Sequence, residues 1–148
     1  MRKTWSELEN AGFVVRHDAS RRELADLRRA IGRCLHDASV RGVSPDGRFA
    51  IAYEAALLYA RMAVACAGWR VRGEGAHGIA FEGLRLAVGP AVSDFAAYFL
   101  RCRRLRNELT YERAGVVEDR DVIELLDRTV RLGEIVEAWI STRHPRLA

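Results

Sequence analysis

Apolar residues recur at every third or fourth position over much of the chain, and this spacing predicts amphipathic helices. Ser20 and Glu23 form a capping-box pattern, in which a hydroxyl and a carboxylate satisfy the free amides of a helix start. The apolar positions that follow this cap are Leu24, Leu27, Ile31, Leu35 and Ala38. We therefore predict an amphipathic helix over about residues 20–41.

The segment from about residue 48 to 68 is apolar nearly all round, which predicts the central helix of the fold. It also contains Glu54 and Arg61 and is rich in alanine. Alanine gives too little transfer energy to offset two mid-span charges in a bilayer, where each costs roughly 2 kcal/mol or more. A buried helix with close neighbours is therefore expected rather than a membrane span.

Three further helices are predicted after the central one, at about 78–88, 91–112 and 118–142. Gly89-Pro90 ends the first of them, and acidic residues near position 118 suit the start of the last. No internal repeat is visible. Five helices with short connections predict an all-α fold, an up-and-down bundle of four to five helices.

The segments outside these helices are short. A small helix near Trp5–Asn10 and an extended piece at residues 13–15 are predicted before the first long helix. The four glycines between Gly68 and Gly78 predict a loop that contains His77. With 148 residues the chain has the size of one domain, so we expect a single helical domain over residues 1–148 with its core at about 20–142.

Cysteine usage and the N-terminus favour the cytoplasm. Cys34, Cys66 and Cys102 are odd in number, far apart and set in apolar helical patterns, so buried thiols are expected and not a disulfide framework or a metal knuckle. The first residues carry no apolar run of signal-peptide length. No metal or other cofactor is expected, because no metal-ligand cluster or phosphate-cradling glycine loop occurs.

The formal net charge is +4, and 23 of the 24 basic residues are arginine because Lys3 is the only lysine. Arginine codons are GC-rich, so the position of the arginines is more informative than their number. They cluster in the stretch RCRRLRNELTYER, residues 101–113. The basic residues are thus most concentrated near the end of the helix predicted at about 91–112.

Projection of this helix at 100° per residue separates the arginines. Arg101 and Arg104 fall on the far side, where solvation explains them. Arg106 falls inside the apolar face of about 120°. That face consists of Phe95, Tyr98, Phe99, Cys102, Leu105 and Leu109.

An unpaired buried charge is too costly to keep, so Arg106 requires a partner. One interpretation is an ion pair with Glu54 that fixes the register of two helices. The other is a polar pocket at a helix or dimer seam, where arginines grip phosphate by forked hydrogen bonds. Asn107 and Tyr111 are i,i+4 neighbours beside it and could share one ligand.

The run Arg106-Asn107-Glu108-Leu109-Thr110-Tyr111 resembles the motif of HEPN domains (higher eukaryotes and prokaryotes nucleotide-binding). These domains are helical bundles whose hallmark is an Arg, often followed by Asn, four to six residues before a His. The resemblance covers about residues 49–142, and the glycine-rich segment ending in His77 is similar to a bacterial branch. Tyr111 stands at the position of the His.

The resemblance implies an RNA-associated protein of toxin–antitoxin or defence type. Many HEPN domains are metal-independent endoribonucleases that dimerise so that two motifs face each other. Others are non-catalytic and bind RNA, a nucleotide or a protein partner such as a nucleotidyltransferase. A homodimer is therefore expected, with RNA or a nucleotide as ligand, an antitoxin or nucleotidyltransferase as a further partner, and no membrane.

The same resemblance assigns roles to individual residues. Arg106 would stabilise the phosphate, Asn107 would orient it, and Tyr111 or His77 would handle the proton, with Glu54 in support. The residues expected to bind the substrate are Arg101, Arg103, Arg104 and His77. Because an unperturbed tyrosine has a pKa of about 10, Tyr111 is a poor base at pH 7 unless arginines depress its pKa.

Two departures from the family pattern leave catalysis open: Tyr111 replaces the His, and Arg113 stands where a common Tyr extension would be. Three hypotheses therefore remain. The chain is an endoribonuclease, a non-catalytic module that binds RNA, a nucleotide or a partner, or an interaction protein without a ligand.

Overall fold

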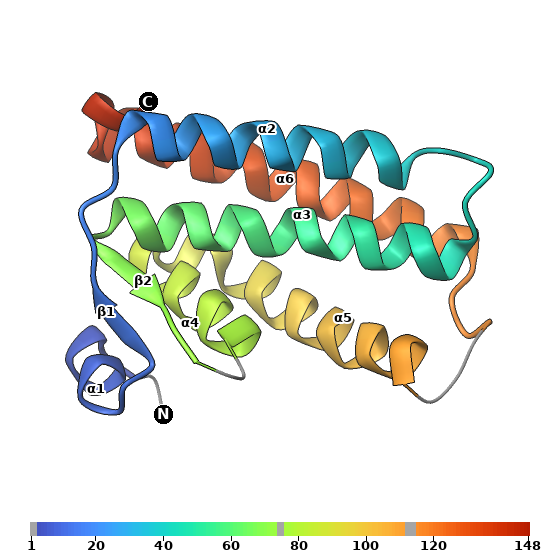
Figure 1. Ribbon diagram of the computed structural model, residues 1–148, viewed down its shortest axis with the longest axis horizontal. Coiled ribbons are helices and arrows are strands. Elements are labelled where there is room, and N and C mark those ends of the chain that lie inside the picture. Colours follow the sequence, from blue (N-terminus) through green and yellow to red (C-terminus); the bar gives the residue numbers. More distant parts are fainter. Residues whose placement is uncertain (1–2, 74–75, 112–114) are drawn as a thin grey trace.

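A computed structural model describes residues 3–73, 76–111 and 115–148, with the backbone alone described at 76–77 and 110–111. The five long helices are α2 (Arg21–Ala38), α3 (Pro45–Cys66), α4 (Ala76–Val88), α5 (Ser93–Tyr111) and α6 (Asp119–Arg143). In Figure 1, α2 and α6 lie on one side of α3, and α4 and α5 lie on the other. The predicted helical bundle is confirmed at this level.

The predicted helix boundaries are close to those of the structure because local signals set them. Ser20 caps α2, its hydroxyl accepting the Glu23 backbone N–H at 3.1 Å. The Glu23 carboxylate does not complete a capping box with it but binds His17 Nε2 at 2.7 and 2.9 Å. At the start of α6, Glu118 and Asp121 do form a complete capping box.

A small two-stranded sheet accompanies the helices, and one of its strands corresponds to the extended piece predicted at residues 13–15. The strand β1 (Val14–Arg16) pairs antiparallel with β2 (Trp69–Val71). The glycine-rich segment was thus wrongly predicted to be loop throughout, since it contains β2 and since α4 begins at Ala76. The strand forms because Gly68 adopts a φ of 96° that turns the chain back, and because Trp69 is buried against α1 (Trp5–Asn10).

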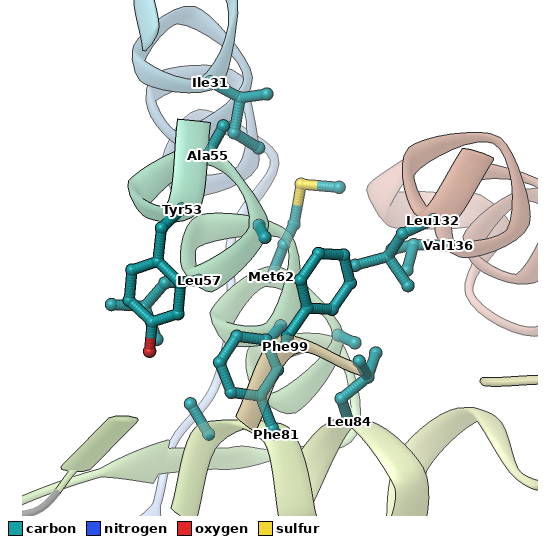
Figure 2. Packing of buried hydrophobic residues seen from close by; sticks show 14 of the residues in the cluster. Ile31, Tyr53, Ala55, Leu57, Met62, Phe81, Leu84, Phe99, Leu132 and Val136 are labelled. Carbon is teal, nitrogen blue, oxygen red and sulfur yellow. The ribbon is translucent and has the colours of Figure 1, made fainter. Parts of the chain in front are cut away.

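The core is centred on α3, which is buried on nearly every face, as predicted. Aromatic rings of neighbouring helices meet there, and the rings of Phe81 on α4 and Phe99 on α5 stack with centroids 5.5 Å apart. Figure 2 shows these rings below Met62 of α3, with Leu132 of α6 beside them. The same view shows the Tyr53 hydroxyl directed away from the Phe99 ring.

By length and composition α3 could also cross a membrane, since an 18-residue window within it has a mean hydropathy of 1.4. Of that window, 67% is buried inside the fold. The core helix of a globular bundle has the same properties, so this single helix is weak evidence for a membrane.

Close approach of α3 and α6 depends on Gly133, which faces Tyr59. A Cβ added at Gly133 would lie 2.5 Å from the Tyr59 hydroxyl oxygen. Gly32 on α2 is the opposite case, because it is exposed and nothing lies within 4 Å of its added Cβ. Alanine substitutions at these two glycines therefore test two different contributions to stability, helix packing at Gly133 and helix propensity at Gly32.

We predict that Gly133→Ala lowers the free energy of unfolding by roughly 1–3 kcal/mol through overpacking against Tyr59. Gly32→Ala should raise it by about 0.5–1 kcal/mol, the helix-propensity gain of alanine. Urea unfolding followed by circular dichroism measures both. A stabilised Gly133→Ala variant would show that α3 and α6 have room to separate.

Candidate functional site

The core-facing side of α5 agrees with the helical projection. Tyr98, Phe99 and Cys102 are buried, while Phe95, Leu105 and Leu109 are half-buried and pack against the core. The opposite face of the helix is directed to solvent and carries Arg101 and Arg104.

The four arginines of α5 fall into two classes. Arg101 and Arg104 are exposed, as predicted, whereas Arg103 and Arg106 are half-buried. The Nε atom of Arg106 is shielded from solvent, and Arg106 is not without a partner. Arg103, in contrast, makes no hydrogen bond or ion pair within the described part of the chain.

The charges of Arg103 and Arg106 both act on a residue that sequence reasoning missed, Tyr53 of α3. Its side chain is fully buried, and burial raises the pKa of its phenol well above 10, while the nearby charges of Arg103 and Arg106 act in the opposite direction. Tyr53 therefore stays neutral at pH 7, as a hydrogen-bonding group and not a base. The only sequence signal for it is a hydroxyl-bearing ring within an otherwise apolar stretch.

The start of α4 adds the third side of this site. Arg103 Nη1 lies 3.9 Å from the position that a Cβ of Gly78 would occupy. A guanidinium thus lies against the first turn of α4, directly after His77 in the chain. The prediction that His77 lies in a loop was wrong, because His77 belongs to α4. Its side chain lies outside the described residues.

Glu54 is placed differently from its predicted role. The Arg106–Glu54 ion pair is not among those that join described residues. Glu54 is half-buried, and its charge raises the pKa of Tyr53 and of the Cys34 thiol on α2, although burial is the larger cause at both. Glu54 thus supplies negative charge between α2 and Tyr53.

Asn107 and Tyr111 complete the predicted motif. Asn107 is half-buried on α5, and Tyr111 is the last residue of that helix, with its side chain outside the described residues. The shared ligand of these two residues stays a prediction.

Arg101 belongs to a separate cluster around Tyr98. Its guanidinium lies 5.8 Å from the Tyr98 ring centroid, and that of Arg128 on α6 lies 4.7 Å from the same centroid. These contacts are cation–π interactions that connect α5 to α6. Asp121 and Glu124 line the adjoining cavity of about 160 Å³, so their charges already balance this cluster.

The geometry around Tyr53 can hold an anion. Two guanidinium groups three residues apart on one helix lie near enough to Tyr53 for their charges to act on its phenol, and one of them has its N–H donors unused among the described residues. Each guanidinium offers a planar fork that matches two phosphate or carboxylate oxygens. We call Tyr53, Arg103 and Arg106 the α5 arginine site.

Comparison of the chain with models of protein families, with curated proteins and with solved structures finds no match.

The buried thiols give the fold a dependence on alkaline pH. Burial raises the pKa of Cys66 and Cys102 from 9.0 to about 11. Because the folded state holds these protons more tightly than the unfolded state, the stabilisation is complete below pH 9 and is lost as pH rises towards 11.

We predict that Cys102→Ala removes part of this pH dependence. Cys102 should contribute a loss of roughly 2–3 kcal/mol between pH 8 and pH 11, since each pKa unit corresponds to about 1.4 kcal/mol. Urea unfolding of both proteins at a series of pH values, with a reductant present, measures the difference. Parallel pH profiles would show that Cys102 ionises as readily in the folded protein as in the unfolded one.

Proposed function

We propose that the protein is an RNA-associated protein of HEPN type, cytoplasmic and acting in a toxin–antitoxin or defence system. In this proposal the α5 arginine site binds the phosphate of RNA. The observation that carries the proposal is the half-buried guanidinium of Arg103, which lies 3.9 Å from the Cβ position of Gly78 and has no carboxylate paired to it among the described residues. The charges of Arg103 and Arg106 both act on the buried Tyr53.

The missing partner of Arg103 can be compared with the ion pairs that other half-buried arginines form. Two half-buried arginines on other helices are paired with glutamates: Arg28 binds Glu137 through two bonds of 2.8 Å, and Arg85 binds Glu82 at 2.7 Å. Arg103 has no such carboxylate partner among the described residues. An anionic ligand would supply the missing charge, and RNA supplies phosphates in series.

Arg103 and Arg106 carry like charges three residues apart on α5, and neither lies in the last turn, where the helix macrodipole favours positive charge. A ligand phosphate would relieve the repulsion between the two guanidinium groups.

Among the described residues the chemistry favours binding over cleavage. Cleavage through the 2′-hydroxyl requires a group that exchanges a proton near pH 7. Tyr53 does not, since burial raises its pKa. Tyr111 or His77 would have to perform that step, so the non-catalytic module remains the nearer alternative, with RNA, a nucleotide or a nucleotidyltransferase as its partner.

The oligomer follows from the same proposal. A homodimer that brings two copies of α5 together would double the number of guanidinium groups facing one RNA strand. An antitoxin would then act by covering α5.

We predict that Arg103→Gln weakens binding of a single-stranded RNA oligonucleotide about tenfold or more at low salt, because one charged contact is lost. The slope of log affinity against log salt should fall by about 0.7 for each phosphate contact removed. Arg103 has no partner among the described residues, so the melting temperature should not change. Fluorescence anisotropy measures the affinity.

The matched control is Arg22→Gln, which removes the same charge from the exposed start of α2. Equal weakening by both variants would mean that only net charge matters and that α5 holds no site. Arg106→Gln should be measured together with these two variants. Because Arg106 has a partner within the fold, Arg106→Gln should lower the melting temperature as well as the affinity for RNA.

A second prediction concerns catalysis. Total RNA incubated with the protein in EDTA should stay intact on a denaturing gel, because a tyrosine at the motif's His position is a poor base at pH 7. Degradation by the wild type that is absent in both Arg106→Ala and Tyr111→Phe would contradict this. It would identify a metal-independent ribonuclease in which tyrosine replaces histidine.

A further inference from the structure

A cavity of about 360 Å³ opens where the start of α2, the end of α3 and the strand β2 meet. Its volume is at the small end of the range for ligand pockets. No sequence motif points to it, and its lining residues do not include any of the α5 arginine site. Its walls therefore have to be analysed separately.

One wall of the cavity is apolar and formed by Leu27, Val64, Ala65 and Val71, with Trp69 beside them. Trp69 is held rigidly: its ring stacks on Trp5 at 5.4 Å, and the Arg16 guanidinium lies 4.2 Å from its centroid. This wall is preformed and could take the hydrocarbon part of a ligand.

Polar groups line the rest of the cavity, namely His17, Glu23, Arg61 and Arg70. The carboxylate of Glu23 is engaged by His17 Nε2 at 2.7 and 2.9 Å. Apart from His17, the lining carries the negative charge of Glu23 and the positive charges of Arg61 and Arg70. The lining therefore has a net positive charge and favours an anion.

Arg61, which lines this cavity, has no anionic partner among the described residues. It is half-buried on α3, yet no hydrogen bond or ion pair joins it to any residue that the structure describes. Arg28 and Arg85, which are similarly half-buried, are both paired with glutamates. A partly desolvated guanidinium without an anion is costly, so an occupant that supplies one is favoured. Arg70 is exposed at the same cavity and adds a second guanidinium.

We propose that this cavity binds a small organic anion, with a phosphate or carboxylate head on Arg61 and Arg70 and an apolar body along Leu27, Val64 and Val71. The site is distinct from the α5 arginine site. Arg61 and Tyr53 are eight residues apart on α3, which is about 12 Å along the helix axis. The proposal therefore does not depend on RNA binding.

Isothermal titration calorimetry with four ligands tests the proposal: phenyl phosphate and benzoate carry both parts, inorganic phosphate carries only a head, and benzyl alcohol is uncharged. We expect saturable binding of phenyl phosphate, benzoate or both, at least about tenfold tighter than that of benzyl alcohol or inorganic phosphate. The tighter of the two aromatic anions identifies the head group. Equal affinity for benzyl alcohol, or no saturable binding of either anion, would overturn the proposal.

Variants locate the site. Arg61→Gln should weaken anion binding about tenfold to a hundredfold, and Arg61→Lys, which keeps the charge but loses the fork, should weaken it less. Arg22→Gln, which removes an exposed charge outside both sites, should leave anion binding unchanged. Loss in Arg103→Gln with retention in Arg61→Gln would place the ligand on α5 and refute this cavity as its site. If Arg61→Gln does not fold, the single variants Arg61→Lys and Arg70→Gln replace it. Unchanged anion binding by both of these variants would refute the cavity as the binding site.

Discussion

Everything in this fold depends on covering α3 on all sides. The helix is apolar around its whole circumference, so four other helices and β2 must pack against it to exclude water. Small residues make this possible, since the alanines of α3 and Gly133 of α6 let neighbouring backbones come close. The free energy of folding is thus concentrated in one shared element.

At the two candidate sites, polar or charged side chains take the place of apolar contacts around α3. The charges of two arginines of α5 act on Tyr53 of α3, and Arg61 two turns later on α3 lines the cavity beside β2. Each site thus includes one residue of α3, the helix that is packed on nearly every face. A ligand at either site would meet at least one side chain with a well-packed backbone, which lowers the entropic cost of binding.

The sequence predicted those features that local periodicity and capping decide. The long helices, the buried character of α3 and the separation of Arg106 from Arg101 and Arg104 all follow from 3.6-residue spacing. The extended piece predicted at residues 13–15 corresponds to β1, but β2 and its pairing with β1 were beyond such reasoning, because a three-residue strand has little local signal. The ladder forms through tertiary burial of Val14 and Trp69, and the glycines around β2 suggested a loop instead. Tyr53 and the cavity at Arg61 arise from contacts between helices, which no spacing along the chain reveals.

The pairing of β1 with β2 has a consequence for how the protein folds. Arg16 lies opposite Trp69, so the ladder closes a loop of some fifty residues that contains all of α2 and α3. Closing such a loop before α2 and α3 pack together would cost chain entropy without a compensating contact. We therefore expect α1 and β1 to join the bundle after α2 and α3 have packed together. Slow hydrogen exchange of the amides in the β1–β2 ladder would then require that α2 and α3 are packed.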